Sequence, residues 1–318
     1  IRDRYCWRGR GVLKGRKVSE EVGCKHLKVL VDHILLLLAQ SRSTAAPSPS
    51  HSHEEDFIVE GLSVRSLIEA GRHLLLWGPP GEGKTTLAEK IAGWLTQRGW
   101  KVLRVEGGPH VSALSLIGGW TLKGRETRWQ SGTLLRAFLE AEDGKGKVVL
   151  TVDELPRIPL REQGVLIAPL YPVEGEFKLS IPELSKTLRV PVGHLFVVAT
   201  GNLGENFSGG LVDRALEERF FPVRIEKNAK ELRKILSKLV AERGFSEELT
   251  DKLLKARKGV EELARQEGVS ITLSLRVMVD ALKVSQEEGQ VPSLITSRFL
   301  RSEERELVQT VLRKVFGV

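Results

Sequence analysis

Residues 78–86 read Gly78-Pro79-Pro80-Gly81-Glu82-Gly83-Lys84-Thr85-Thr86 and directly follow the apolar run His73-Leu74-Leu75-Leu76-Trp77. Their spacing fits the pattern G-x-x-x-x-G-K-[ST]. A buried strand, a glycine-rich turn and the start of a helix, in this order, are typical of a phosphate-binding loop. We therefore predict that residues 78–86 contact a nucleoside triphosphate.

The residue types in this loop suit phosphate chemistry. Glycines let backbone N–H groups turn towards phosphate oxygens, and the N-terminus of the following helix adds partial positive charge. Lys84 can reach the β- and γ-phosphates, and the hydroxyl of Thr85 can bind Mg²⁺. We expect ATP and Mg²⁺ as cofactors. ATP is favoured over GTP because the chain has no Asn-Lys-x-Asp motif for guanine.

The composition indicates a globular protein. The chain has 318 residues, of which 41% are hydrophobic and 28% charged, enough for a sizeable core. The net charge of +8 is partly local, because residues 1–28 hold nine basic and three acidic side chains. Charge alone is therefore weak support for nucleic-acid binding. The chain has two cysteines, Cys6 and Cys24, from which neither a disulfide framework nor a zinc site follows, and we expect reduced thiols. No stretch is long enough to span a membrane, and we expect a cytoplasmic protein.

The pattern divides the chain into three parts. Residues 1–55 are basic and of low complexity, and we expect a disordered appendage with at most a short helix at 26–39. Residues 56–226 alternate apolar runs with helical patterns. Residues 227–318 show helical spacing only, which predicts a separate all-helical lid domain.

The middle part predicts an α/β fold of the P-loop NTPase type. Its apolar runs lack polar alternation, as in strands buried on both faces. Five such strands with helices between them predict a parallel sheet that helices cover on both faces. The predicted strands are 73–77, 101–106, 147–153, 194–200 and 221–226. The predicted helices are 60–70, 84–98, 132–142, 160–168 and 211–219, and then 229–242, 246–267, 272–288 and 296–315. Residues 176–180 and 188–190 predict either a small hairpin or a long loop.

Residues 147–154 form an apolar run that ends in two acids, Asp153 and Glu154. A carboxylate at a strand end beside the phosphate loop can hold Mg²⁺, and the next one can polarise the attacking water. We therefore assign Asp153 to the metal, together with Thr85, and Glu154 to the water. This is the Walker B pattern of a hydrolase.

Three further polar residues are candidates. Asn202 follows the run 196–200 and can sense the γ-phosphate, with a helix cap as the alternative role. Arg219 precedes the last predicted strand and can act on the nucleotide of a neighbouring subunit as an arginine finger. Arg214 is the second candidate for that role, and a surface ion pair is the alternative for either arginine. Arg276 begins a helix of the second domain and can reach the phosphates.

These features, in this order over about residues 56–290, resemble the AAA+ ATPases. Two segments narrow the resemblance to the MoxR, CbbQ and dynein-related group. They are Val111-Ser112-Ala113-Leu114-Ser115-Leu116-Ile117-Gly118-Gly119-Trp120 and Arg128-Trp129-Gln130-Ser131-Gly132-Thr133-Leu134-Leu135-Arg136-Ala137. The segment Asp213-Arg214-Ala215-Leu216-Glu217-Glu218-Arg219-Phe220 is similar to the arginine-finger region of that group.

The resemblance implies a homo-oligomeric ring, usually a hexamer, that hydrolyses ATP at subunit interfaces. It also implies remodelling or activation of a protein partner, often one with a von Willebrand A domain. The chain lacks the aromatic-hydrophobic-Gly pore loop of threading AAA+ proteins, and residues 1–55 have no counterpart in the group. Two alternatives remain: a translocase or restriction-type motor that nucleic acid stimulates, and a monomeric P-loop kinase or nucleotide switch.

Overall fold

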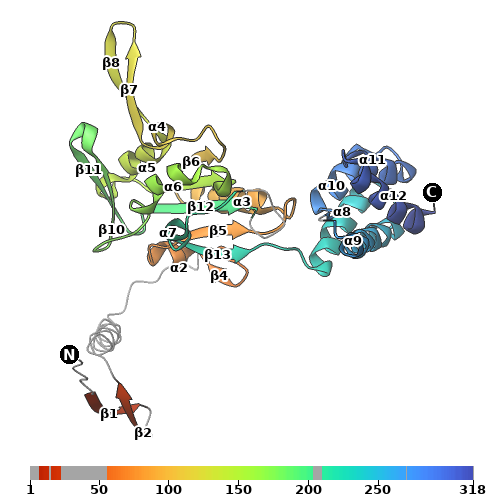
Figure 1. The fold of residues 1–318 in the computed structure, drawn as a ribbon, viewed down its shortest axis with the longest axis horizontal. Coiled ribbons are helices and arrows are strands. Elements are labelled where there is room, and N and C mark those ends of the chain that lie inside the picture. Colours follow the sequence, from red (N-terminus) through yellow and green to blue (C-terminus); the bar gives the residue numbers. More distant parts are fainter. Residues whose placement is uncertain (1–6, 14–15, 23–55, 203–209, 270, 318) are drawn as a thin grey trace. The chain divides into compact units, whose positions relative to one another are not determined.

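The computed structural model describes residues 7–13, 16–22, 56–202, 210–269 and 271–317 (Figure 1). The chain forms two compact units, Ile1–Glu55 and Asp56–Val318. In the first unit, β1 (Trp7–Leu13) pairs antiparallel with β2 (Arg16–Val22). The sequence does not predict these strands, because glycines and charged residues are depleted in strands generally. The helix expected at 26–39 lies outside the described residues.

The second unit contains the predicted five-stranded parallel sheet. Its spatial order is β13-β5-β12-β9-β6, and every neighbouring pair is parallel. The strands are β5 (His73–Trp77), β6 (Lys101–Glu106), β9 (Val148–Asp153), β12 (Leu195–Gly201) and β13 (Phe220–Arg224). The α/β fold class is therefore confirmed, and each strand lies within two residues of its predicted range.

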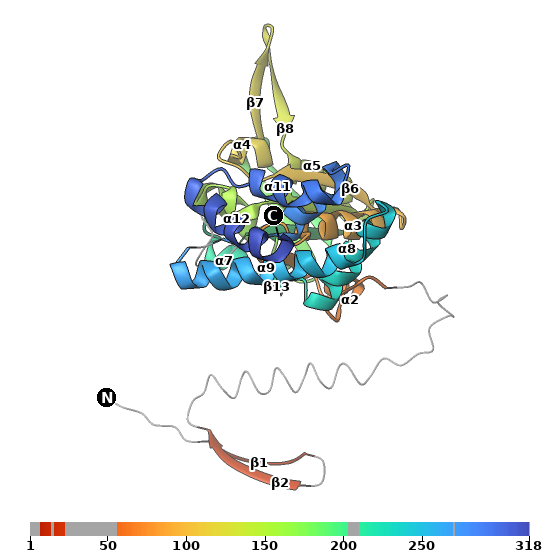
Figure 2. The ribbon, with the colours of Figure 1, turned by 90° about the vertical axis from the view of Figure 1, so that its right-hand side faces the viewer.

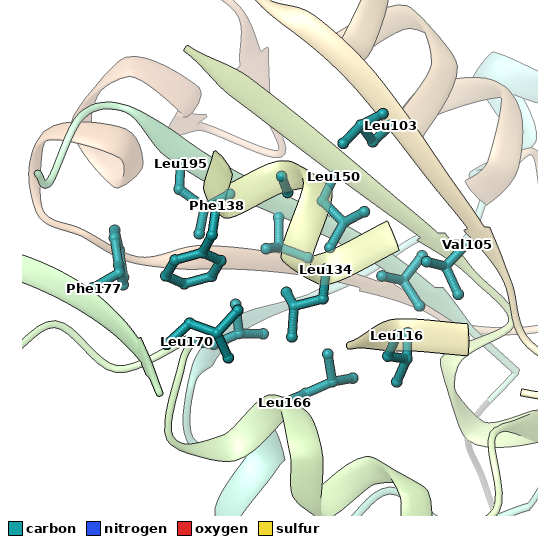
Figure 3. Packing of buried hydrophobic residues seen from close by; sticks show 14 of the residues in the cluster. Leu103, Val105, Leu116, Leu134, Phe138, Leu150, Leu166, Leu170, Phe177 and Leu195 are labelled. Carbon is teal, nitrogen blue, oxygen red and sulfur yellow. The ribbon is translucent and has the colours of Figure 1, made fainter. Parts of the chain in front are cut away.

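Helices cover both faces of this sheet. Successive strand residues point to opposite faces, and apolar residues on each face pack against helices. Leu75 and Leu150 join a cluster with α5 (Thr133–Ala141) and α6 (Leu160–Ile167), whose packing Figure 3 shows. Leu74 and Leu76 join a second cluster with α2 (Val64–Glu69) and α3 (Lys84–Thr96). The sheet is thus the middle of three layers, and its strand ends are left free for chemistry.

Two antiparallel hairpins are inserted between these elements. β10 (Glu176–Ile181) and β11 (Lys186–Pro191) pair as a hairpin, which confirms that prediction over the alternative of a loop. β7 (Gly118–Lys123) and β8 (Glu126–Ser131) form a second hairpin, which the sequence does not predict. It extends away from its neighbours α4 (Ala113–Leu116) and α5 in both views (Figures 1 and 2). Further short elements include β3 (Ile58–Val59), β4 (Leu62–Ser63) and α7 (Arg214–Glu217).

The C-terminal region is helical, as predicted, and has its own apolar cluster. Its helices are α8 (Ala229–Glu242), α9 (Glu248–Glu267), α10 (Leu275–Val284), α11 (Val291–Ser297) and α12 (Ser302–Phe316). The predicted start of the helix at 296–315 is wrong. Residue 296 lies in α11, and α12 begins only at Ser302, after a non-helical connection. Phe299 in this connection is buried in the cluster, whereas Leu300 is exposed.

Candidate functional site

The phosphate-binding loop leaves the carboxyl end of β5, and two of its glycines are required by geometry. Gly78 and Gly81 have φ angles of 142° and 80°. A Cβ atom would lie 2.5 Å from the carbonyl oxygen of Ile225 at the first position and 2.7 Å from Ser274 Oγ at the second. A side chain at either position would therefore both strain the backbone and displace a neighbour. Gly83 then serves as the N-cap of α3.

Lys84 follows this loop as the first residue of α3. Its Nζ donates hydrogen bonds to the carbonyl oxygens of Gly78 (3.0 Å) and Pro79 (2.7 Å), and to Oδ1 of Asn202 (2.6 Å). The side chain is nearly covered, and burial lowers its pKa below 10.5, although the negative charge of Glu154 opposes this shift. The ammonium is thus held where phosphate oxygens could replace these acceptors.

The two acids and the amide lie at the ends of β9 and β12. Because β5, β12 and β9 are consecutive in the sheet, their carboxyl ends meet at one edge. The hydroxyl of Thr85 donates to Oδ1 of Asp153 (2.9 Å). The amide of Asn202 donates to both carboxylate oxygens of Glu154, at 2.8 and 3.1 Å. The fold thus brings together Lys84 and these four residues.

The donor set suits Mg²⁺. A threonine hydroxyl and a carboxylate are hard oxygen ligands, and Mg²⁺ takes only one or two such groups before completing its shell with water and phosphate. Within the described ranges, no group of three or more His, Cys, Asp or Glu side chains could hold a metal ion. Thr85 and Asp153 are therefore the residues that fit the ion.

Neither candidate finger belongs to this cluster. Arg219 directly precedes β13, whose first residue pairs with His73 at the amino end of β5, so it lies at the opposite edge of the sheet from the loop. Its Nε donates to the carbonyl oxygen of Ile167 (3.2 Å), and its guanidinium lies 4.6 Å from the ring centre of Tyr171. Arg214 is exposed on α7.

Arg276, in contrast, lies beside the loop. Its Cβ is 3.3 Å from the position that a Cβ on Gly81 would occupy. Its positive charge also contributes, as a smaller cause, to the lowered pKa of Lys84. The remaining loop residues Pro80 and Thr86 are exposed at the same place.

The sequence does not indicate two further residues of this site. The first is Arg257 on α9, whose Nη2 lies 3.0 Å from Oε1 of Glu82. Glu82 is fully buried, and its Oε2 also accepts a hydrogen bond from the Lys227 N–H (3.2 Å). Arg257 is far away in the chain, so no local pattern indicates this pair. The second is Thr200 on β12, which contacts both acids. A hydroxyl within an otherwise apolar strand is the signal that could have indicated it.

A protein-family model agrees with this arrangement. Residues 73–220 match the model of the AAA domain family, dynein-related subfamily. A comparison with curated proteins found no match. No helix within the described part of the chain is long and apolar enough to cross a membrane.

Two solved structures are similar at low identity. A "putative ATPase" from Cytophaga hutchinsonii is 18% identical, with 76% of this chain and 77% of that chain covered and a TM-score of 0.37. NtrX from Brucella abortus is 17% identical, with 86% of this chain and 55% of that chain covered and a TM-score of 0.39. Scores this low carry no argument, so the assignment comes from the family model and the site. Residues 73–220, just under half of the chain, therefore resemble the AAA domains of the dynein-related subfamily.

Proposed function

We propose that this protein binds Mg·ATP and hydrolyses it to ADP and phosphate. The observation that carries the proposal is the pair of contacts at neighbouring strand ends, between Thr85 and Asp153 and between Asn202 and Glu154. They give the two acids different environments beside one loop, as metal binding and water activation require.

In the proposed reaction, Lys84 and the N–H groups of the loop bind the β- and γ-phosphates, and Asn202 orients the attacking water. The water oxygen bonds to the γ-phosphorus, the bond from that phosphorus to the β–γ bridging oxygen breaks, and Glu154 accepts the proton. Thr85 and Asp153 would hold Mg²⁺, which supplies positive charge to the phosphate oxygens.

The same proposal includes a ring. AAA proteins commonly assemble in rings, and the position of Arg219 at the far edge of the sheet supports a role on a neighbour's nucleotide rather than its own. Following the resemblance to the MoxR group, we propose a hexamer in the cytoplasm. Its movements would remodel or activate a protein partner, such as one with a von Willebrand A domain.

ATP turnover tests the core of this proposal. The variant Glu154→Gln keeps the shape of the side chain but cannot take a proton, so turnover should fall by about 10² or more while ATP binding persists. The matched control Glu69→Gln changes an exposed glutamate on α2 and should turn over ATP at the wild-type rate. Wild-type turnover in Glu154→Gln would refute the assignment. Strong, salt-sensitive stimulation by nucleic acid would instead favour the translocase.

A further inference from the structure

Thr200 connects the two acids of the site to the neighbouring strand. Its side chain is only 2% exposed, on β12 two residues before Asn202. The hydroxyl donates a hydrogen bond to Oδ1 of Asp153, the same oxygen that accepts from Thr85. It also accepts a hydrogen bond from the backbone N–H of Glu154 at 3.0 Å.

The directions of these hydrogen bonds are fixed by chemistry. A backbone N–H can only donate, and an ionised carboxylate can only accept. The single hydroxyl proton of Thr200 is therefore committed to Asp153, and a lone pair of the same oxygen is committed to Glu154. The Thr200 hydroxyl thus positions two groups, the carboxylate of Asp153 and the backbone of Glu154.

The backbone of Glu154 needs such support. Its φ and ψ angles are 54° and 47°, in the left-handed region that non-glycine residues enter only at an energetic cost. Gly107 closes the other side, because a Cβ there would lie 2.2 Å from the Glu154 carbonyl oxygen. Between Thr200 and Gly107, the backbone that directs the Glu154 carboxylate towards Asn202 has little freedom.

We propose that Thr200 is a positioning residue for ATP hydrolysis, acting through Asp153 and Glu154; this inference rests on the proposed function. Thr200 holds Asp153 in place for the metal and keeps Glu154 in the left-handed conformation. Valine has the same shape without the hydroxyl, whereas serine keeps the hydroxyl. The contribution of the two hydrogen bonds can therefore be separated from packing.

The test compares Thr200→Val and Thr200→Ser in the full chain. We expect Thr200→Val to lower kcat at saturating Mg·ATP by about 30-fold, which is the equivalent of two hydrogen bonds of about 1 kcal/mol each. It should also raise the Mg²⁺ concentration for half-maximal binding of a fluorescent ATP analogue about threefold. Affinity for that analogue in EDTA should stay unchanged. Thr200→Ser should restore both Mg²⁺-dependent values.

Thr151→Val is the matched control. Thr151 lies on the adjacent strand β9, but its hydroxyl donates its single proton to the backbone carbonyl oxygen of Leu103 (3.3 Å) rather than to a carboxylate. It should therefore leave kcat and the Mg²⁺ dependence unchanged. If Thr200→Val does not fold, Thr200→Ala and Thr200→Ser give the same comparison, since they differ by one hydroxyl.

The outcomes separate the two proposals. A wild-type protein that neither binds nor hydrolyses ATP refutes the proposed function. A wild-type protein that hydrolyses ATP while Thr200→Val matches it in kcat and Mg²⁺ dependence overturns the role of Thr200 alone. Equal losses in Thr200→Val and Thr200→Ser, or in Thr200→Val and Thr151→Val, also overturn it, because packing would then explain the effect.

Discussion

His73, at the start of β5, is a buried titratable residue outside the proposed chemistry. Its imidazole stacks on Phe177, with ring centres 5.2 Å apart, and Nδ1 accepts the backbone N–H of Val197 (3.2 Å). Burial, with a smaller contribution from the charge of Arg72, lowers its pKa from 6.5 to about 3. The ring is therefore neutral in the folded protein at pH 7.

This shift makes stability depend on pH. The folded pKa lies below the unfolded value, so the unfolded state gains a proton first as pH falls. The stability is fully present above pH 6.5 and is lost progressively towards pH 3. Between pH 7.5 and 5 the loss from His73 is about 2 kcal/mol.

Urea unfolding at these two pH values, on wild type and His73→Phe, isolates that contribution. Phenylalanine keeps the ring volume and does not titrate, so its free energy of unfolding should fall less with acid, whatever its absolute stability. Equal pH dependence in the two proteins would show that His73 is already protonated when folded, or is neutral in both states.

How far single residues can be predicted depends on how local their signal is. Lys84 and Thr85 belong to one short motif, and Asp153 and Asn202 end apolar runs, so the sequence alone indicates their roles. The partner of Glu82 could not be predicted in the same way. Arg257 lies on an amphipathic helix where an arginine is ordinarily solvated, and only the three-dimensional fold brings it to the loop.

At the scale of elements, the three central strands β5, β9 and β12 are buried on both faces as predicted, whereas the outer strands β6 and β13 keep exposed residues. β5 apart from His73, and β12 apart from Thr200, are apolar runs, which leaves little ambiguity. The hairpin β7–β8 was missed because it buries neither face fully: Trp120 is 57% and Leu122 75% exposed. Its stability comes from cross-strand pairing, such as the edge-to-face contact of Trp120 with Trp129. Such pairing is not visible as a hydrophobic period in the sequence.

The ion pair of Glu82 and Arg257 fixes the phosphate loop to α9, and it leads to a second prediction. Arg257→Met leaves the fully buried Glu82 carboxylate without its cation, and should cost about 3–5 kcal/mol of unfolding free energy. The double variant Glu82→Gln/Arg257→Met removes both charges and should recover most of that loss.

A double-mutant cycle by urea unfolding measures this coupling. Lys258→Met is the control, because its ion pair with Glu262 is exposed and should change stability by about 1 kcal/mol or less. Additive effects of the Glu82 and Arg257 substitutions would mean that the two side chains do not interact in the folded protein.

At the scale of the whole molecule, the sheet order separates the proposed catalytic groups into two sets. The loop, both acids and Asn202 share the carboxyl edge of the sheet, and Arg276 lies beside the loop. Arg219 and the start of β13 lie at the opposite side, where the amino ends of the strands meet. Under the proposed function, an arginine finger at that position would act on the nucleotide of a neighbouring copy. Each chain would then contribute residues to two different sites.

Shared sites predict complementation between inactive proteins. Arg219→Ala keeps its own acids, and Glu154→Gln keeps its own finger, so each alone should lose most ATP turnover. In a randomly mixed ring, about a quarter of the interfaces would combine an intact Glu154 with an intact Arg219. An equimolar mixture should therefore hydrolyse ATP at about that fraction of the wild-type rate.

Light scattering of Glu154→Gln in Mg·ATP, where about six copies are expected, checks assembly independently. Mixed rings without recovered turnover would exclude a finger acting in trans at Arg219, and full loss in Arg214→Ala would assign the role to Arg214.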